Sequence, residues 1–112
     1  MSDTIAAIAT GAQISAIGIV RISGERSIEI VDRLFTPSNG KRMSECESRK
    51  LVYGRLSNAQ GELLDLCLCT ISRAPNSYTG EDTAELQCHG SPVVLRAALE
   101  EIFALGARQS GP

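Results

Sequence analysis

One carboxylate and one guanidinium, each within a run that otherwise suits a β-strand, are the side chains best suited to chemistry in this sequence. Glu85 lies in the alternating run of residues 83–88, on the side of the predicted strand opposite Leu86 and Cys88. Arg21 lies in the middle of the apolar run of residues 17–23. Because a partly buried cation is costly unless it is paired, we expect Arg21 to have an anionic partner or to extend its head group to water.

A carboxylate on a strand is a good acceptor for a planar ligand. Its two oxygens can accept two parallel N–H bonds, such as those from the ring N3–H and the exocyclic amine of a 2-amino-4-oxo pteridine. A strand also fixes the angle between carboxylate and ring more firmly than a loop does. From the residues alone, however, we favour a solvated position for Glu85. For Arg21 we favour a structural ion pair or an extended side chain.

Other catalytic and metal-binding signatures are weak or absent in the sequence. It has no GxxxxGK[ST] phosphate loop and no Gly-rich dinucleotide turn, so we expect no GTP site in these residues. A serine–histidine–carboxylate set around His89 is a weak signal, because one histidine stands among many serines. The cysteines are Cys46, Cys67, Cys69 and Cys88. They lack zinc-type spacing, so we favour buried structural thiols over metal ligands and predict no metal site.

Length and composition predict a single domain, residues 1–112. With 43% hydrophobic residues, 4% aromatic residues and no tryptophan, its core must consist of Ile, Leu, Val and Ala. A formal net charge of -2 gives no electrostatic footprint for nucleic acid, so we do not expect this segment to supply most of any nucleic-acid affinity. No apolar run approaches the length of a membrane span, which needs about 18 residues. No secretory signal is visible either. We therefore expect a cytoplasmic protein without membrane contact.

The hydrophobic pattern predicts five strands, at residues 3–9, 17–23, 51–57, 63–73 and 83–88. Helices are predicted over residues 24–35 and about 92–105, and a solvated loop over residues 41–50. The nearly continuous apolar run of residues 63–73 is typical of a central strand covered on both faces. This order predicts an α+β domain with a mixed, largely antiparallel sheet of about five strands and two main helices on one side.

Two motifs resemble a known family. DTIAAIAT and IGIVRISG at residues 3–10 and 17–24, with PNSYTGEDTAELQCHGSP at residues 75–92, resemble the N-terminal domain of the bacterial tRNA-modification GTPase family called MnmE or TrmE. The resemblance extends from Asp3 to the last residue. It departs from the family in the loop after the first strand. That loop reads GAQISA at residues 11–16, where the family usually has a Pro-Pro-Gly-rich loop.

This resemblance implies a folate site. The family's N-terminal domain is similar in fold to the tetrahydrofolate-binding domains of aminomethyltransferases, and it binds 5-formyl-tetrahydrofolate. A strand-two arginine and the glutamate of a GEDxxEL-type motif contact the folate in that family, and they correspond to Arg21 and Glu85. A lysine and the far C-terminus, both beyond this sequence, supply further contacts. Secondary candidates, for which we favour a structural role, lie in or beside the motif: Tyr78, Thr79, Glu81 and His89.

For the intact protein, the resemblance implies a homodimeric, potassium-stimulated, magnesium-dependent GTPase that works with a flavin-dependent partner called MnmG or GidA. Together they would introduce the 5-carboxymethylaminomethyl group at the wobble uridine of certain tRNAs, and the folate domain would supply a one-carbon unit. The family's helical and GTPase domains are absent from these residues, which look like an excised fragment. GTP, potassium and magnesium would therefore bind outside this segment.

Three hypotheses follow. The first is a folate-binding module of a tRNA-modifying enzyme, in which Glu85→Gln should abolish pterin binding and leave the fold intact. The second is a dimerisation module without a ligand, in which Arg21 and Glu85 form a structural pair. In that case Glu85→Gln should weaken dimerisation or stability. The third, an aminomethyltransferase-like enzyme acting alone, ranks last because that fold encloses its substrate with further domains.

Overall fold

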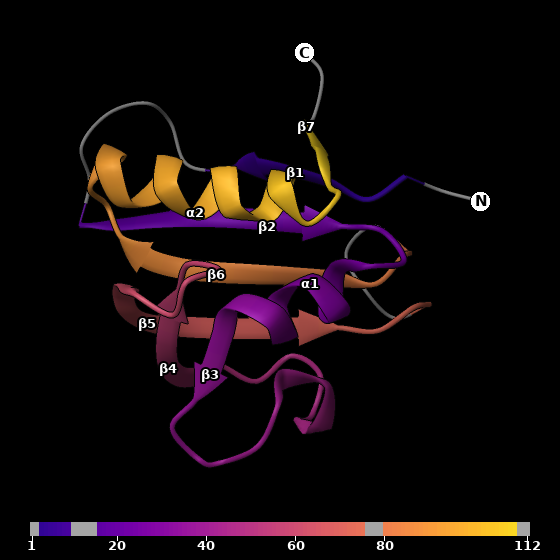
Figure 1. Cartoon of the computed structure of the whole chain (residues 1–112). Helices are drawn as coiled ribbons and strands as arrows, with labels where there is room; N and C mark the ends of the chain where they lie inside the picture. Colours follow the sequence, from indigo (N-terminus) through magenta and orange to yellow (C-terminus); the bar gives the residue numbers. More distant parts are fainter. Residues whose placement is uncertain (1–2, 10–15, 76–79, 110–112) are drawn as a thin grey trace.

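In the computed structural model, which describes residues 3–9, 16–75 and 80–109, two helices lie on one face of a mixed sheet (Figure 1). The helices are α1 (Ser27–Leu34) and α2 (Pro92–Ala104), with a short 3-10 helix at Met43–Glu45. The strands are β1 (Ile5–Ile8), β2 (Ile17–Ser23), β3 (Phe35–Pro37), β4 (Val52–Ser57), β5 (Leu63–Ser72), β6 (Thr83–His89) and β7 (Arg108–Gln109).

The strands form one sheet in the order β3-β4-β5-β6-β2-β1-β7. Every neighbouring pair is antiparallel except β1 and β7, which are parallel. The predicted class, the mixed and largely antiparallel sheet and the two helices are thus confirmed. The sheet has seven strands rather than about five. The additional strands, β3 and β7, lie at its edges and have three and two residues, too few to show an alternating pattern in the sequence.

Strand β3 begins where we expected the first helix to end. Phe35, predicted to be helical, is 2% exposed and pairs with Leu56 of β4. Gly54 of β4 allows this close approach, because a Cβ atom there would collide with the Thr36 carbonyl oxygen and the Phe35 ring. The burial of Phe35 in an extended conformation is therefore a tertiary effect that overrides its helical spacing.

The segment of residues 41–50 is mostly exposed, as its polarity predicts, but it is not purely a loop. It contains the 3-10 helix, in which Met43 is completely buried. Arg49 has a positive φ of 65°, and its backbone N–H donates to the Ile71 carbonyl oxygen at 2.7 Å. This segment is therefore attached to the end of β5.

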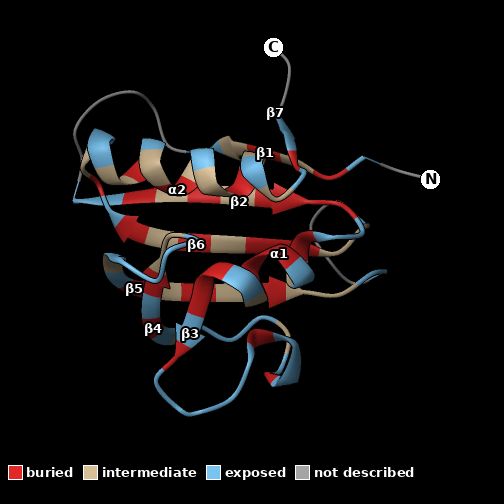
Figure 2. Ribbon diagram, viewed as in Figure 1, coloured by how far each residue is buried: buried red, intermediate tan, exposed pale blue. Residues whose placement is uncertain are grey.

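The core lies between the sheet and the two helices, and Figure 2 shows buried stripes running along the central strands. Alternate residues of three adjacent strands are 0% exposed: Val20 and Ile22 of β2, Ala84 and Leu86 of β6, and Cys69 and Ile71 of β5. The opposite face is open, since Leu66 of β5 is 44% exposed. The prediction that β5 is covered on both faces is wrong, because helices cover only one.

Helix α2 agrees closely with its sequence signals. Ser91 occupies the N-cap position with an extended backbone, and Pro92 is the first helical residue, where its missing N–H costs nothing. Gly106 has a φ of 115°, which provides the left-handed residue that ends many helices. Among the described residues, neither α1 nor α2 has the length and apolar character required to cross a membrane.

Candidate functional site

Arg21 and Glu85 meet on the open face of the sheet. They are direct cross-strand partners in the β2–β6 ladder, and the Arg21 Nε–H donates to Glu85 Oε2 at 2.6 Å. Their side chains are 39% and 24% exposed. The structure therefore brings together the two residues that the sequence singled out, and the anionic partner expected for Arg21 is Glu85.

Glu85 also faces an open hollow of about 280 Å³. Thr70 of β5 is its cross-strand partner on the other side. The lining residues are Arg49, Leu51, Thr70, Ser72, Thr83, Glu85 and Gln87. The lining thus includes one acidic residue, one basic residue, three hydroxyl-bearing residues, one amide and the apolar Leu51.

Sequence reasoning missed Arg49 as a site residue. It lies in a polar stretch without periodicity, and the bond from its N–H to the end of β5 places it beside the hollow. A non-glycine residue with positive φ is uncommon, but no sequence signal reveals that conformation. The sequence predicts strands at Thr70 and Gln87 but no functional role for them. Their position beside the hollow depends on the sheet register.

The two sequence motifs lie against each other at the start of β6. The backbone N–H of Gly24 donates to the Asp82 carbonyl oxygen at 2.9 Å. The completely buried Ser27 hydroxyl is 2.8 Å from the Gly24 carbonyl oxygen and 3.1 Å from that of Asp82. The Asp82 carboxylate accepts from the Ala74 N–H at 2.8 Å. The Gly24 and Ser27 bonds join the end of β2 to the start of β6, and the Ala74 bond joins the end of β5 to the same place. The first two help to set the register that pairs Arg21 with Glu85.

The secondary candidates do not gather around Glu85. Tyr78 and Thr79 lie outside the described residues, as does all of the GAQISA loop except Ala16. Glu81 accepts from the Ser23 hydroxyl at 3.3 Å. His89 lies at the far end of β6, where its Nδ1 is 2.7 Å from Asp65 Oδ1. Structural roles for Glu81 and His89 agree with these contacts, and their part in ligand binding stays a prediction.

The four cysteines are free and buried. Cys67 and Cys69 point the same way from β5, as their spacing predicts; they face the helix-covered side and are 5% and 0% exposed. A hydrogen bond to Cys88, together with burial, raises the pKa of the Cys67 thiol, and burial raises that of Cys69. Asp65, Cys67 and Cys88 have their ligand atoms within 4.8 Å of one another, a grouping that linear spacing did not indicate.

Comparison with known proteins leads to the same family as the two sequence motifs. Residues 4–112 match the family model described as "GTP-binding protein TrmE N-terminus". The chain belongs to this family. The match covers both motifs except Asp3, and it includes Arg21 and Glu85.

Curated relatives of this TrmE domain are named "tRNA modification GTPase MnmE". The chain is 44% identical to the protein from Symbiobacterium thermophilum over 98% of its own length and 24% of that protein's length. It is 44% identical to one from Synechococcus sp. over 100% of the chain and 24% of the relative. For Bacteroides fragilis the identity is 45%, over 98% of the chain and 23% of the relative. The chain therefore spans about a quarter of the length of these relatives.

Proposed function

We propose that this TrmE domain binds 5-formyl-tetrahydrofolate on the open face of its sheet. Glu85 accepts the ring N3–H and the exocyclic amine of the pterin, and Arg21 orients the carboxylate and contacts the ligand. The bound folate supplies a one-carbon unit. The observation that carries the proposal is the direct pairing of Arg21 with Glu85 beside a polar hollow.

The donor and acceptor groups suit a pterin. An ionised carboxylate has about four acceptor positions, so the bond from Arg21 leaves capacity for two parallel N–H donors. A hollow of about 280 Å³ is slightly smaller than typical pockets for drug-sized ligands, which begin near 300 Å³. We infer that it receives the pterin ring and that the remainder of the folate extends beyond it.

The exposure of the ion pair favours a ligand-binding role over a purely structural one. Side chains that are 39% and 24% exposed form an ion pair worth only about 0–1 kcal/mol to folding. Glu85 is therefore replaceable without loss of the fold. A ligand carrying two parallel N–H donors would add two further charge-assisted hydrogen bonds to the same carboxylate.

Within a longer protein, we propose that the domain serves a GTPase that modifies the wobble uridine of tRNA, introducing a 5-carboxymethylaminomethyl group. Family membership and the length of the relatives support this proposal. The GTP, magnesium and potassium sites, the helical domain and the contacts to a MnmG/GidA-type partner and to tRNA would then lie outside residues 1–112. The four free thiols agree with a reducing compartment such as the cytoplasm.

The decisive experiment is a calorimetric titration of the chain with 5-formyl-tetrahydrofolate. We expect saturable binding, weakened about 10- to 100-fold in Glu85→Gln, because glutamine cannot accept both N–H bonds. Arg21→Ala should weaken binding as well. Glu100 is an exposed carboxylate on α2. The Glu100→Gln variant is therefore the matched control and should bind folate like the unaltered chain.

The free energy of unfolding measured on the same variants completes this test. We expect Glu85→Gln to change it by less than about 1 kcal/mol. Equal affinity in Glu85→Gln and the unaltered chain would refute the assignment of Glu85.

A dimerisation module without its own ligand is the second candidate function. It is favoured by the apolar side chains on the open face, since Leu51, Tyr53 and Leu66 are 53%, 52% and 44% exposed. We propose that a second copy of the chain covers this face. In a dimerisation module without folate binding, Glu85→Gln would alter dimerisation or stability and no folate titration would saturate.

A further inference from the structure

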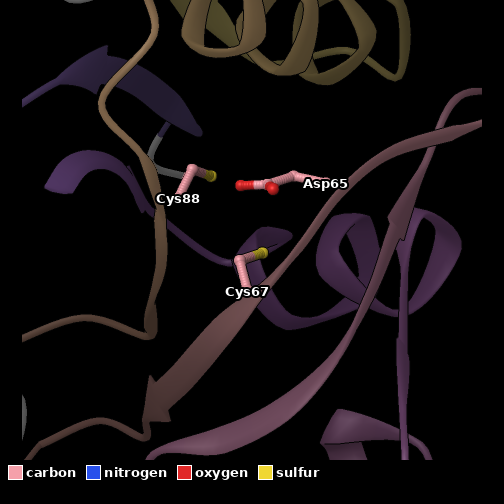
Figure 3. Close-up of side chains that lie close together, drawn as sticks. All are labelled: Asp65, Cys67 and Cys88. Atoms are coloured by element: carbon pink, nitrogen blue, oxygen red, sulfur yellow. The ribbon is translucent and has the colours of Figure 1, made fainter. Parts of the chain in front are cut away.

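A cluster of sulfur and oxygen atoms lies on the opposite face of the strands that carry Glu85 and Thr70. Asp65 and Cys67 belong to β5 and Cys88 to β6, and their ligand atoms lie within 4.8 Å of one another. Figure 3 shows the three side chains pointing toward one another. The last paired residues of the ladder here are Leu68 and Gln87. The register therefore places Cys67 opposite Cys88.

The cluster is enclosed but close to the surface. Cys67 and Cys88 are 5% and 2% exposed, and the Asp65 side chain is 10% exposed. The His89 side chain, at the adjacent position, is 73% exposed. The Asp65 carboxylate therefore links the buried thiols to an exposed histidine.

The Asp65 carboxylate is held in place by one residue. Oδ2 accepts from the His89 backbone N–H at 2.8 Å, and Oδ1 is 2.7 Å from His89 Nδ1. Each carboxylate oxygen has a second lone pair, so both contacts leave an acceptor position for a cation. Fixing a ligand by a neighbouring hydrogen bond is how metal sites orient their carboxylates.

We propose that Asp65, Cys67 and Cys88 form a site for a thiophilic divalent cation, Zn²⁺. Tetrahedral zinc with Zn–S distances of about 2.3 Å and Zn–O distances of about 2.0–2.2 Å needs ligand atoms roughly 3.3–3.8 Å apart. Atoms that already lie within 4.8 Å of one another reach this spacing by small side-chain rotations. Both thiols release their protons to solvent on binding, and a water molecule completes the coordination. This site is independent of the proposed folate site, because it lies on the other face of the sheet.

The test uses Co²⁺ as a spectroscopic probe on the metal-free, fully reduced chain. We expect one equivalent of Co²⁺ to produce tetrahedral d–d bands and a sulfur-to-cobalt charge-transfer band, both abolished by an equivalent of Zn²⁺. Cys67→Ser and Cys88→Ser should each halve the charge-transfer band and weaken Co²⁺ binding at least about tenfold. Zn²⁺ should raise the melting temperature of the unaltered chain.

Cys46→Ala is the matched control, because Cys46 is a buried free thiol outside the cluster, and it should bind Co²⁺ like the unaltered chain. Asp65→Asn serves if a serine variant fails to fold, since Asp65 is partly exposed; it should keep the charge-transfer band and weaken Co²⁺ binding. No charge-transfer band in the unaltered chain, or the same band in the Cys67→Ser, Cys88→Ser double variant, would overturn the proposal.

Discussion

Arg21 and Glu85 are in contact across two strands, yet both side chains keep part of their surface in water. That exposure limits what the pair contributes to folding and leaves the carboxylate accessible from the hollow. Ser27 presents the contrasting case, a polar side chain that is completely buried. At the residue scale, burial therefore separates side chains that hold the fold from side chains that are open to a ligand.

Replacement of Ser27 should be costly. Ser27→Ala removes the hydroxyl that lies within hydrogen-bond distance of the Gly24 and Asp82 carbonyl oxygens. We expect the free energy of unfolding to fall by about 1–3 kcal/mol, because a buried hydrogen-bonding arrangement is lost. Urea unfolding measures the change. Ser38→Ala, at an exposed position, should stay within about 0.5 kcal/mol of the unaltered chain. Equal effects at both positions would contradict this interpretation.

Strands β5 and β6 carry different chemistry on their two faces. On the open face, Thr70 lies beside Glu85. On the helix-covered face, Cys67 lies beside Cys88. Because successive side chains on a strand point to opposite sides, one pair of strands serves both proposed sites, and a substitution at one need not disturb the other. The stability of strands β5 and β6 depends on the helices that pack against the helix-covered face.

Helix α2 should supply much of that stability through one buried stripe. Ile102→Ala removes a side chain that is 0% exposed, and we expect it to lower the free energy of unfolding by about 2–5 kcal/mol. Val93 on the same helix is 78% exposed, so Val93→Ala should change the value by less than about 0.5 kcal/mol. Thermal or urea unfolding distinguishes the two. A small effect of Ile102→Ala would mean that α2 is not essential to the core.

At the scale of the whole molecule, the open face is the surface that the domain leaves uncovered. It combines the hollow beside Glu85 with exposed Leu51, Tyr53 and Leu66. Leu51 both lines the hollow and is one of the exposed apolar side chains. If a second copy covers this face, folate binding and association are coupled.

Association should therefore depend on the open face. We expect the chain to sediment as a dimer and Tyr53→Glu to weaken the dimer at least about tenfold, because a buried unpaired charge is unfavourable. Val93→Glu places the same charge on α2, at a residue that is 78% exposed, and should leave the dimer intact. Sedimentation velocity over a concentration series is the measurement. Dimers of equal strength in both variants would place the interface elsewhere.

Local patterns predicted most elements to within a few residues. The alternation at residues 17–23 agrees with β2 (Ile17–Ser23), and Ser91-Pro92 correctly marks the start of α2. These elements follow from short-range physics, namely side-chain alternation and the capping preferences of single residues. Strands β3 and β7 escaped prediction because three and two residues are too few to show an alternating pattern, so that only their pairing with β4 and β1 identifies them.

The sequence by itself determined the fold class, the family and the identity of Arg21 and Glu85 as residues of interest. Only the tertiary structure decided that these two side chains touch, that Arg49 lies beside the same hollow, and that Cys67 lies opposite Cys88. Each of these results depends on the register between strands, and a shift of one residue would move every side chain to the other face. Register depends on contacts between distant segments, such as the bond from Gly24 to Asp82, and no local pattern records them.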